Sequence, residues 1–519
     1  MMVEIYDTTL RDGTQAEDFN LQLEDKLKIA QRLDELGVHY IEGGWPGSNP
    51  KDIQFFKKVR NLSLKKAKIV AFGSTHHPRT LPQNDKNLNA LLEAKTEVIT
   101  VFGKSWDLHV TDALRIALER NLEIIYDSLA YLRPRVKKLF YDAEHFFDGF
   151  KRNSEYALAT IGKAIEASAD CIILCDTNGG TLPHEIEQIV RAIKNRFPRL
   201  NWGIHAHNDA EMAVANTLLA VRLGASQVQG TINGVGERCG NANLCSVIPA
   251  LKLKMGINCV SDEQLKKLAH LSRFVTELLN VPHPKYLPYV GGSAFAHKGG
   301  VHISAVERNP NTYEHIPPEK VGSSRRILVS ELSGKGTILS KAKEYGLILR
   351  ERHIKSILKE VKTLESQGFQ FDVAEASFEL MMRRVCGALP AYFKLLTYRV
   401  HDYNTSEGRP VAEAEIWVEV NGEARHAMSL GQGPVNALDR ALRKAIEDSY
   451  PNLKEMVLVD YRVRVLPGTP GTEAKIRVLI ESKDRQGSWQ TVGVSHDILE
   501  ASLQALVDSI VYKLFKDER

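Results

Sequence analysis

Short apolar runs alternate with helical segments through the first half of the chain, and this alternation constrains the fold more than any other feature. Each run has the length and composition of a buried strand. The segment between the first two runs, residues 23–37, has apolar residues at helical spacing and ends on a glycine, a common helix end. The eight candidate strands are residues 3–7, 38–42, 68–72, 97–101, 123–127, 171–176, 202–206 and 227–231.

Eight strands that alternate with helices over about 230 residues fit a (β/α)8 barrel well, and a doubly wound open sheet less well. We therefore predict an α/β protein with a TIM-barrel catalytic domain over residues 1–260. Residues 261–385 read as mainly helical linker subdomains, with a loop-rich interruption at 282–333, and residues 386–519 as a separate C-terminal α+β domain.

The C-terminal domain shows a weak internal duplication. A strand at 413–420 precedes a helix at 434–449, and a second round follows with strands at 458–465, 474–481 and 490–495 and a helix at 498–515. This repetition predicts a pair of βββα units. Since the domain carries no obvious catalytic constellation, we expect it to sense a ligand or to form a dimer.

Composition excludes some classes of function. The 519 residues are 43% hydrophobic, which is ample for two or three domains with real cores. A net charge of +4 does not suggest a partner among nucleic acids or membrane surfaces. The chain has no signal-like start, no apolar stretch of about 18 residues, and no CxxC pair among its six cysteines. We expect a soluble, cytoplasmic protein.

A barrel of this kind builds its site at the C-terminal ends of its strands, so polar residues just after each strand are the candidates. These are, in chain order, Arg11, Asp12, Glu42, His76, His77, His109, Asp127, Glu144, Asp148, Thr177, Asn178, His205, His207 and residues 233–241.

His205 and His207 form the most specific pattern among these candidates. Residues i and i+2 of a strand point to the same face, so the two imidazoles would project side by side. Taken alone, this spacing is more often ordinary polar sequence at a strand end. The first strand, however, is followed by Arg11 and Asp12. Two imidazole nitrogens and one carboxylate oxygen make a workable divalent-cation site with positions left open for substrate.

Three glycine-containing segments are candidate binding loops. Residues 234–240 resemble a dinucleotide fingerprint, but the third glycine falls one place late and the segment follows the eighth strand, so we reject that function. Residues 333–337 (SGKGT) lack the upstream glycine of a phosphate loop. Residues 297–302 (HKGGVH) predict a tight turn that presents two histidines, or else an ordinary surface loop.

Three motifs together carry a family resemblance. Residues 7–13 (DTTLRDG), 205–209 (HAHND) and 234–242 (GVGERCGNA) resemble the signatures of the isopropylmalate, homocitrate and citramalate synthases, a family of metal-dependent acyl-CoA condensing barrels. The resemblance covers essentially the whole chain, including a C-terminal domain similar to the family's amino-acid-sensing domain. Residues 45–52, 102–109, 175–183 and 297–302 look most like the citramalate synthase branch.

The resemblance implies condensation of acetyl-CoA with pyruvate to (R)-citramalate and CoA, the entry to an isoleucine route. By analogy Asp12, His205 and His207 would bind Mg²⁺, Mn²⁺ or Zn²⁺, with Asn241 close by as a further ligand or as a group that supports the ligands. Such a cation would polarise the ketone, and Arg11 would stabilise the alkoxide. Substrate-binding roles are expected for Arg11, Thr177, which would hold the carboxylate, Glu42, which could position Arg11, and His109.

The same resemblance implies a histidine base paired with a carboxylate. His302 matches the histidine, and a pKa near neutrality suits that task. The carboxylate is Asp148, or alternatively Glu144. A homodimer in which the linker of one subunit covers the barrel of the other is also implied, as is isoleucine as an allosteric ligand of the C-terminal domain.

Other functions stay open on the sequence alone. The chain could be a 2-isopropylmalate synthase that takes 2-oxoisovalerate, because pocket size decides between acceptors. A barrel lyase is less compatible with the C-terminal domain. A non-catalytic amino-acid sensor is a third possibility, against which the intact Arg11, Asp12, His205 and His207 argue.

Overall fold

A computed structural model describes residues 2–17, 19–279, 281–329, 333–405, 408–466 and 473–518. Its internal contacts divide the chain into two compact units. The barrel unit comprises residues 1–295 and 316–325, and the C-terminal unit comprises residues 296–315 and 326–519. Each unit is described separately.

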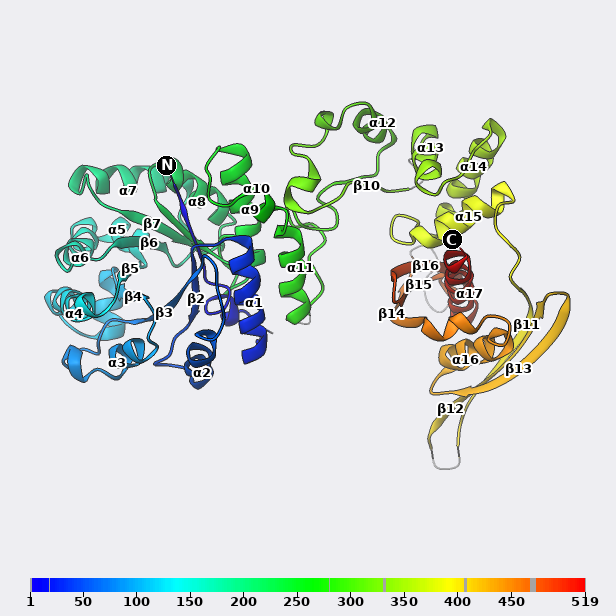
Figure 1. Cartoon of the computed structure of the whole chain (residues 1–519), viewed down its shortest axis with the longest axis horizontal. Helices are drawn as coiled ribbons and strands as arrows, with labels where there is room; N and C mark the ends of the chain where they lie inside the picture. The colour runs from blue at the N-terminus through cyan, green and yellow to red at the C-terminus, as the bar shows by residue number, and fades with distance from the viewer. Residues whose placement is uncertain are drawn as a thin grey trace. The chain divides into compact units, whose positions relative to one another are not determined.

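The barrel unit contains eight parallel strands that pair in chain order and close through β8 and β1 (Figure 1). The predicted (β/α)8 barrel is therefore confirmed. The strands are β1 (Glu4–Asp7), β2 (Tyr40–Gly44), β3 (Lys68–Ser74), β4 (Val98–Lys104), β5 (Lys138–Glu144), β6 (Cys171–Asp176), β7 (Trp202–Ala206) and β8 (Gln227–Gly230).

Helices surround the strands, and the main hydrophobic core lies between the two layers. Gly37 ends α1 in the left-handed conformation, with a φ of 87°, which a glycine adopts without steric cost. The helices are α1 (Leu23–Leu36), α2 (Pro50–Val59), α3 (Lys86–Glu93), α4 (Leu118–Leu132), α5 (Phe146–Arg152), α6 (Ser154–Glu166), α7 (Pro183–Arg196), α8 (Ala213–Arg222), α9 (Leu244–Pro249), α10 (Asp262–Leu265) and α11 (Leu268–Leu278).

The strand predicted at 123–127 is wrong. This segment lies inside α4, whose buried residues include Asn121, Ile124, Ile125, Ser128 and Leu129. That spacing follows the helical period, and a short apolar run cannot by itself distinguish a buried helix turn from a strand. The fifth strand is β5 at Lys138–Glu144, so Asp127 lies on an outer helix and not at the barrel mouth.

Side chains fill the inside of the barrel in layers. One cluster is wholly apolar or aromatic and comprises Tyr6, Tyr40, Val70, Val98, Phe140, Cys171, Ile173 and Cys175. Glu42, Thr100 and Asp142 lie two residues beyond Tyr40, Val98 and Phe140 on the same strands. They point to the same side as those residues because the strand period is two. Tyr6 donates its hydroxyl to Glu42 Oε2 (2.5 Å) and lies 2.9 Å from Thr100 Oγ1. The barrel interior thus changes from apolar to polar toward the C-terminal ends of the strands.

The C-terminal unit begins with helical subdomains. Its short parallel strands β9 (Ala296–His297) and β10 (Arg326–Ile327) pair with each other. The helices here are α12 (Gly300–Arg308), α13 (Lys335–Glu344), α14 (Glu351–Gln367) and α15 (Glu375–Cys386). Residues 330–332, within the predicted interruption, lie outside the described residues.

Two antiparallel three-stranded sheets follow, each completed by a helix, which confirms the predicted duplication of βββα units. The first unit contains β11 (Lys394–Asn404), β12 (Pro410–Val420), β13 (Glu423–Gly431) and α16 (Pro434–Ile446). The second contains β14 (Val457–Val465), β15 (Ile476–Asp484), β16 (Gly487–Ser495) and α17 (Ile498–Asp517). Ala412, Ala414, Ile416 and Val418 alternate along β12 and are fully buried in the core that includes α16.

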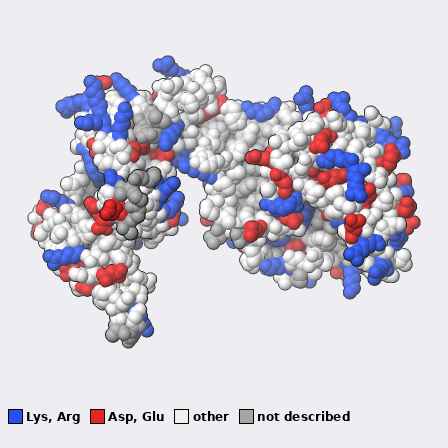
Figure 2. Space-filling model, turned by 180° about the vertical axis from the view of Figure 1, so that it is seen from behind, with Lys and Arg blue, Asp and Glu red and all other residues white. Residues whose placement is uncertain are grey.

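Acidic and basic side chains are interspersed on the visible face of the barrel unit (Figure 2), in keeping with the net charge of +4. Among the described residues, no helix is both long and apolar enough to cross a membrane. The cytoplasmic location stays a prediction.

Candidate metal and substrate site

Three predicted metal ligands meet at the mouth of the barrel. Asp12 follows β1, His205 lies on β7, and His207 comes directly after that strand. Nε2 of His205 lies 3.2 Å from Asp12 Oδ2, and Nε2 of His207 lies 3.8 Å from the same oxygen. All three residues are buried, and one donor atom from each lies within 4.8 Å of the other two.

The donor set fits a divalent cation. Asp12 Oδ1, His207 Nδ1 and Asn241 Oδ1 are buried and have no hydrogen-bond partner among the described residues. Asn241 is held beside His207 by a backbone bridge between the two residues. Buried polar atoms without partners are costly, and a cation accepts oxygen and imidazole ligands together. Asp12, His205 and His207 therefore form a possible cation site, and Asn241 lies beside it.

Neighbouring side chains orient these ligands. Gln229 Oε1 lies 3.0 Å from His205 Nδ1, so the amide oxygen can accept that N–H and leave the Nε2 lone pair for a cation. Burial opposes ionisation of Asp12, but the Arg11 guanidinium and the His205 hydrogen bond outweigh it and hold the pKa of Asp12 well below its ordinary value. Burial and the nearby His205 lower the pKa of His207 to about 3, so this ring is neutral, as a ligand must be.

Arg11 is fixed between two carboxylates. Its Nε donates to Glu42 Oε1 over 2.5 Å, and its Nη1 lies 3.5 Å from Asp12 Oδ2. The guanidinium carbon lies 3.9 Å from the centre of the Phe72 ring. Burial lowers the pKa of Arg11, but the carboxylates of Glu42 and Asp12 more than offset this and raise it above its ordinary value. The site therefore holds a permanent positive charge beside the cation ligands.

A cavity of about 180 Å³ opens in front of these groups. One wall is aromatic: the Trp45 and Phe102 rings lie 5.4 Å apart edge to face, and Phe72 stacks on Phe102 at 5.3 Å. Cavities for drug-sized ligands usually measure about 300–1,000 Å³, so this one suits a ligand of few heavy atoms. Its lining consists of Arg11, Asp12, Gln15, Trp45, Phe72, Phe102, Asp142, Glu144, Cys175, Thr177, His205, His207 and Glu237.

The two carboxylates considered as partners of the base lie in different surroundings. Glu144, the last residue of β5, lines the cavity and forms an ion pair with Lys104. Asp148 does not line the cavity; its Oδ2 lies 3.3 Å from His145 Nδ1 and accepts a hydrogen bond from Asn178 Nδ2 (3.0 Å).

The other predicted residues are dispersed. Thr177 lines the cavity, and its hydroxyl oxygen accepts the His145 backbone N–H (2.8 Å). His109 lies outside the cavity lining, with its ring centre 4.2 Å from that of His145. His302 belongs to the C-terminal unit, where it is exposed on α12 and stacks on Tyr313 at 4.1 Å. Its role at the barrel stays a prediction.

Sequence reasoning missed several cavity residues, including Asp142 and the aromatic wall. Asp142 was hidden because the fifth strand was misplaced, and burial together with Glu42 raises its pKa to about 7. Alternation along β5 would have revealed it, since Phe140, Asp142 and Glu144 share one face. The aromatic residues carry no such signal, because aromatic side chains at strand ends read equally well as core.

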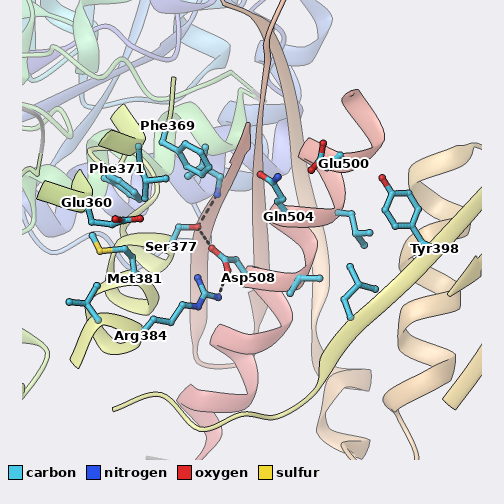
Figure 3. Close-up of a pocket in the computed structure, with 16 residues that line it drawn as sticks. Glu360, Phe369, Phe371, Ser377, Met381, Arg384, Tyr398, Glu500, Gln504 and Asp508 are labelled. Atoms are coloured by element: carbon cyan, nitrogen blue, oxygen red, sulfur yellow. Dashed lines mark hydrogen bonds and ion pairs between the residues drawn. The ribbon is translucent and has the colours of Figure 1, made fainter. Parts of the chain in front are cut away.

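The C-terminal unit has a larger cavity of its own, of about 540 Å³ (Figure 3). Ser377 Oγ donates to Asp508 Oδ2 (2.8 Å), and Arg384 Nη2 donates to Asp508 Oδ1 (2.6 Å). Most other lining side chains are apolar. The lining consists of Glu360, Leu364, Phe369, Phe371, Ser377, Met381, Arg384, Val385, Leu395, Tyr398, Val492, Glu500, Leu503, Gln504, Val507 and Asp508.

Three family models match consecutive parts of the chain. Residues 2–275 match the HMGL-like family, residues 289–368 the homocitrate synthase post-HMGL domain-like family, and residues 372–514 the LeuA allosteric (dimerisation) domain. These matches follow the same order along the chain as the barrel, the helical subdomains and the paired βββα units.

Curated relatives match over the full length. An (R)-citramalate synthase of Geobacter sulfurreducens is 56% identical, with 100% of this chain and 98% of that protein covered. An (R)-citramalate synthase of Aquifex aeolicus is 54% identical, with 99% and 98% covered. A probable 2-isopropylmalate synthase of Methanopyrus kandleri is 34% identical, with 98% and 97% covered.

We expect the wild-type protein to bind one divalent cation per chain at this site, and Asp12→Asn and His207→Gln each to weaken that binding by at least about tenfold. Isothermal titration with Mn²⁺ after chelation measures this. A cation at 100 times its Kd should stabilise the native state by about 2.7 kcal/mol, which a thermal melt detects. The matched control is His184→Gln, at an exposed histidine of α7. Equal Mn²⁺ affinity in all four proteins would contradict the assignment.

Proposed function

This chain belongs to the HMGL-like family and, within it, to the (R)-citramalate synthases, and we propose that it condenses acetyl-CoA with pyruvate to give (R)-citramalate and free CoA. The observation that carries the proposal is the Asp12, His205 and His207 cluster facing a cavity of about 180 Å³. We further propose that this cluster and Asn241 hold the divalent cation on which the reaction depends.

When bound, the cation would supply a Lewis acid toward the keto acid. Arg11 contributes a second positive charge. Because Glu42 and the Phe72 ring fix its guanidinium, Arg11 can stabilise negative charge on the keto oxygen without reorganising. Glu42 thus positions Arg11 and does not contact substrate.

We propose that Thr177, which lines the cavity, holds the substrate carboxylate. Its oxygen already accepts the backbone N–H of His145, so its own O–H remains available as a donor toward the cavity. A single hydroxyl orients the keto acid, and Arg11 and the cation supply the charge.

The aromatic wall sets the size of the acceptor. Trp45, Phe72 and Phe102 pack edge to face and face to face, so a branched side chain would have to displace rings that support each other. This favours the methyl of pyruvate over the isopropyl group of 2-oxoisovalerate. A non-catalytic sensor would not need the intact cation ligands and fixed arginine, which argues against that alternative.

We assign the base to His302 with a carboxylate of the barrel. Both candidates have partners, Lys104 for Glu144 and His145 and Asn178 for Asp148, but only Glu144 lines the cavity. We therefore propose Glu144 as the carboxylate that acts with His302 in removing a proton from the methyl of acetyl-CoA.

The wild-type enzyme should release CoA from acetyl-CoA with pyruvate at a kcat/KM at least about tenfold above that with 2-oxoisovalerate, since a few methyl groups are worth ~1–3 kcal/mol. Phe102→Ala should narrow this ratio by enlarging the cavity. Thiol release measured with both acceptors tests it, with Phe274→Ala on α11, away from the cavity, as the control. A wild-type preference for 2-oxoisovalerate would overturn the proposed substrate.

His302→Ala and Glu144→Gln should each lower kcat by about 10²–10⁴, the usual contribution of general acid–base catalysis. Asp148→Asn should cost clearly less than Glu144→Gln. Mn²⁺ and pyruvate binding, followed by calorimetry, should persist in all three variants because none is a cation ligand. If Asp148→Asn were the more damaging of the two carboxylate changes, Asp148 would be the partner of the base.

We also propose a homodimer formed through the C-terminal domain and inhibition by isoleucine bound there. The matching domain is described as allosteric and dimerising, and Val457, Val459 and Val463 of β14 are 54%, 50% and 43% exposed, an apolar surface that a second copy would cover. The apolar cavity of Figure 3 suits a branched side chain, with Glu360, Glu500 and Arg384 offering charge to the ammonium and carboxylate groups.

Isoleucine should lower the wild-type rate. The Val507→Trp side chain should fill this cavity and raise the half-inhibitory concentration of isoleucine at least about fivefold, a change within the usual range of allosteric coupling. Ile498→Trp, at an exposed position on the same helix, serves as the control. Rates measured against isoleucine concentration test the site. Unchanged inhibition in Val507→Trp would place the effector elsewhere, and an uninhibited wild type would remove isoleucine as the effector.

A further inference from the structure

Three aromatic rings contact one another where β4 and β5 end. Trp106 stacks on His109 with ring centres 5.2 Å apart, and His145 lies 4.2 Å from His109 and 5.5 Å from Trp106. None of the three lines the small cavity. The cluster is not explained by the roles assigned so far.

Within the described part of the chain, two ring nitrogens of this cluster lack partners. Trp106 Nε1 and His109 Nδ1 are buried and make no hydrogen bond among the described residues. An indole nitrogen can only donate, and an imidazole nitrogen carrying hydrogen also donates. Burial, the neighbouring His145 and Lys104 lower the pKa of His109, so its ring is neutral near pH 7. Leaving buried donors unused costs free energy, which an oxygen acceptor supplied by a ligand would recover.

The backbone around the cluster is strained. His145 adopts a φ of +55° and Arg115 a φ of +54°, both unusual for residues other than glycine. A π-helical turn, His109–Leu114, ends at Arg115 and carries one of the unpartnered rings. Such turns and left-handed residues occur preferentially at functional sites, where surrounding contacts must hold them.

Those surrounding contacts lead directly to the cavity. The backbone N–H of His145 donates to Thr177 Oγ1 (2.8 Å), and the N–H of Ser105 donates to the carbonyl oxygen of Glu144 (3.1 Å). Thr177 and Glu144 both line the cavity. Trp106 is therefore one residue in sequence from Ser105, which is hydrogen-bonded to Glu144 of the cavity wall, and the His109 ring contacts His145, which is hydrogen-bonded to Thr177.

We infer that Trp106 Nε1–H and His109 Nδ1–H bind the thioester oxygen of acetyl-CoA and stabilise the negative charge that develops on it. The inference rests on the proposed function, because it supplies the donors that the acetyl group needs. When the base takes a proton from the methyl carbon, the C–H electron pair forms a carbon–carbon double bond and the C=O pair moves onto oxygen. That oxygen then accepts hydrogen bonds from the two N–H groups.

His145 and Asp148 act here as positioning residues. Asp148 holds Nδ1 of His145, Asn178 holds Asp148, and the His145 ring packs on His109. This chain of contacts fixes the imidazole of His109 relative to Trp106, and it gives Asp148 a function that does not require it to reach the substrate.

The test removes each donor and keeps an apolar side chain in its place. Trp106→Phe and His109→Leu should each lower kcat/KM for acetyl-CoA by about 100-fold, the usual cost of one such donor, with KM for pyruvate changed less than about threefold. His109→Asn places an amide N–H near the former Nδ1 and should restore at least tenfold over His109→Leu. Trp417→Phe, which removes an indole N–H in the C-terminal unit, is the control.

A second measurement isolates the proton-removal step. Deuterium incorporation into the acetyl-CoA methyl in D₂O, with oxamate in place of pyruvate and detection by mass spectrometry, should fall in the same two variants. If the wild type turns over pyruvate and both variants have rates within about threefold of the wild-type rate, the inference is overturned and the proposed function stays intact. His109→Asn as impaired as His109→Leu would overturn the donor role of His109. A wild type that does not turn over pyruvate would overturn both proposals.

Discussion

The carboxylate of Asp12 is the electrostatic centre of the barrel mouth, because Arg11, His205 and His207 all direct a nitrogen toward it. A buried carboxylate requires such compensation. Only a closed barrel supplies it here: β7 and β1 both neighbour β8, so the end of the chain's first strand meets the end of its seventh. The strand order that closes the barrel therefore also brings the candidate cation ligands together.

The remaining features of the site follow from this arrangement. Glu42 neutralises Arg11, and Tyr6 donates to Glu42 from the apolar layer below. The aromatic wall narrows the cavity on the side away from the cation ligands. In the proposed function, substrate choice and chemistry are separated: aromatic packing would limit the size of the acceptor, and buried charges would stabilise the change in electron density. The C-terminal unit has its own core and its own cavity, and the proposed inhibition by isoleucine is assigned to that cavity.

Much of this could be predicted from sequence, for identifiable physical reasons. The barrel follows from strand and helix alternation, and the candidate cation ligands follow from residue type and strand spacing, as with His205 and His207. Prediction failed where a pattern was short or ambiguous. The run at 123–127 is predicted as a strand because its two buried apolar residues fit either period, but it lies in α4. This error hid Asp142 on β5. The unpartnered nitrogens of Trp106 and His109 depend on three-dimensional packing and leave no trace in sequence. The roles assigned to His302 and to isoleucine stay predictions.

The central claim is that the cavity joins the acetyl group of acetyl-CoA to pyruvate. Incubation of the wild-type protein with [¹³C₂]acetyl-CoA, unlabelled pyruvate and Mn²⁺, followed by mass spectrometry, tests it directly. The account predicts citramalate that carries both labelled carbons, in amounts equal to the CoA released. Labelled acetate with no labelled citramalate would contradict it, since the protein would then hydrolyse the thioester without forming the carbon–carbon bond.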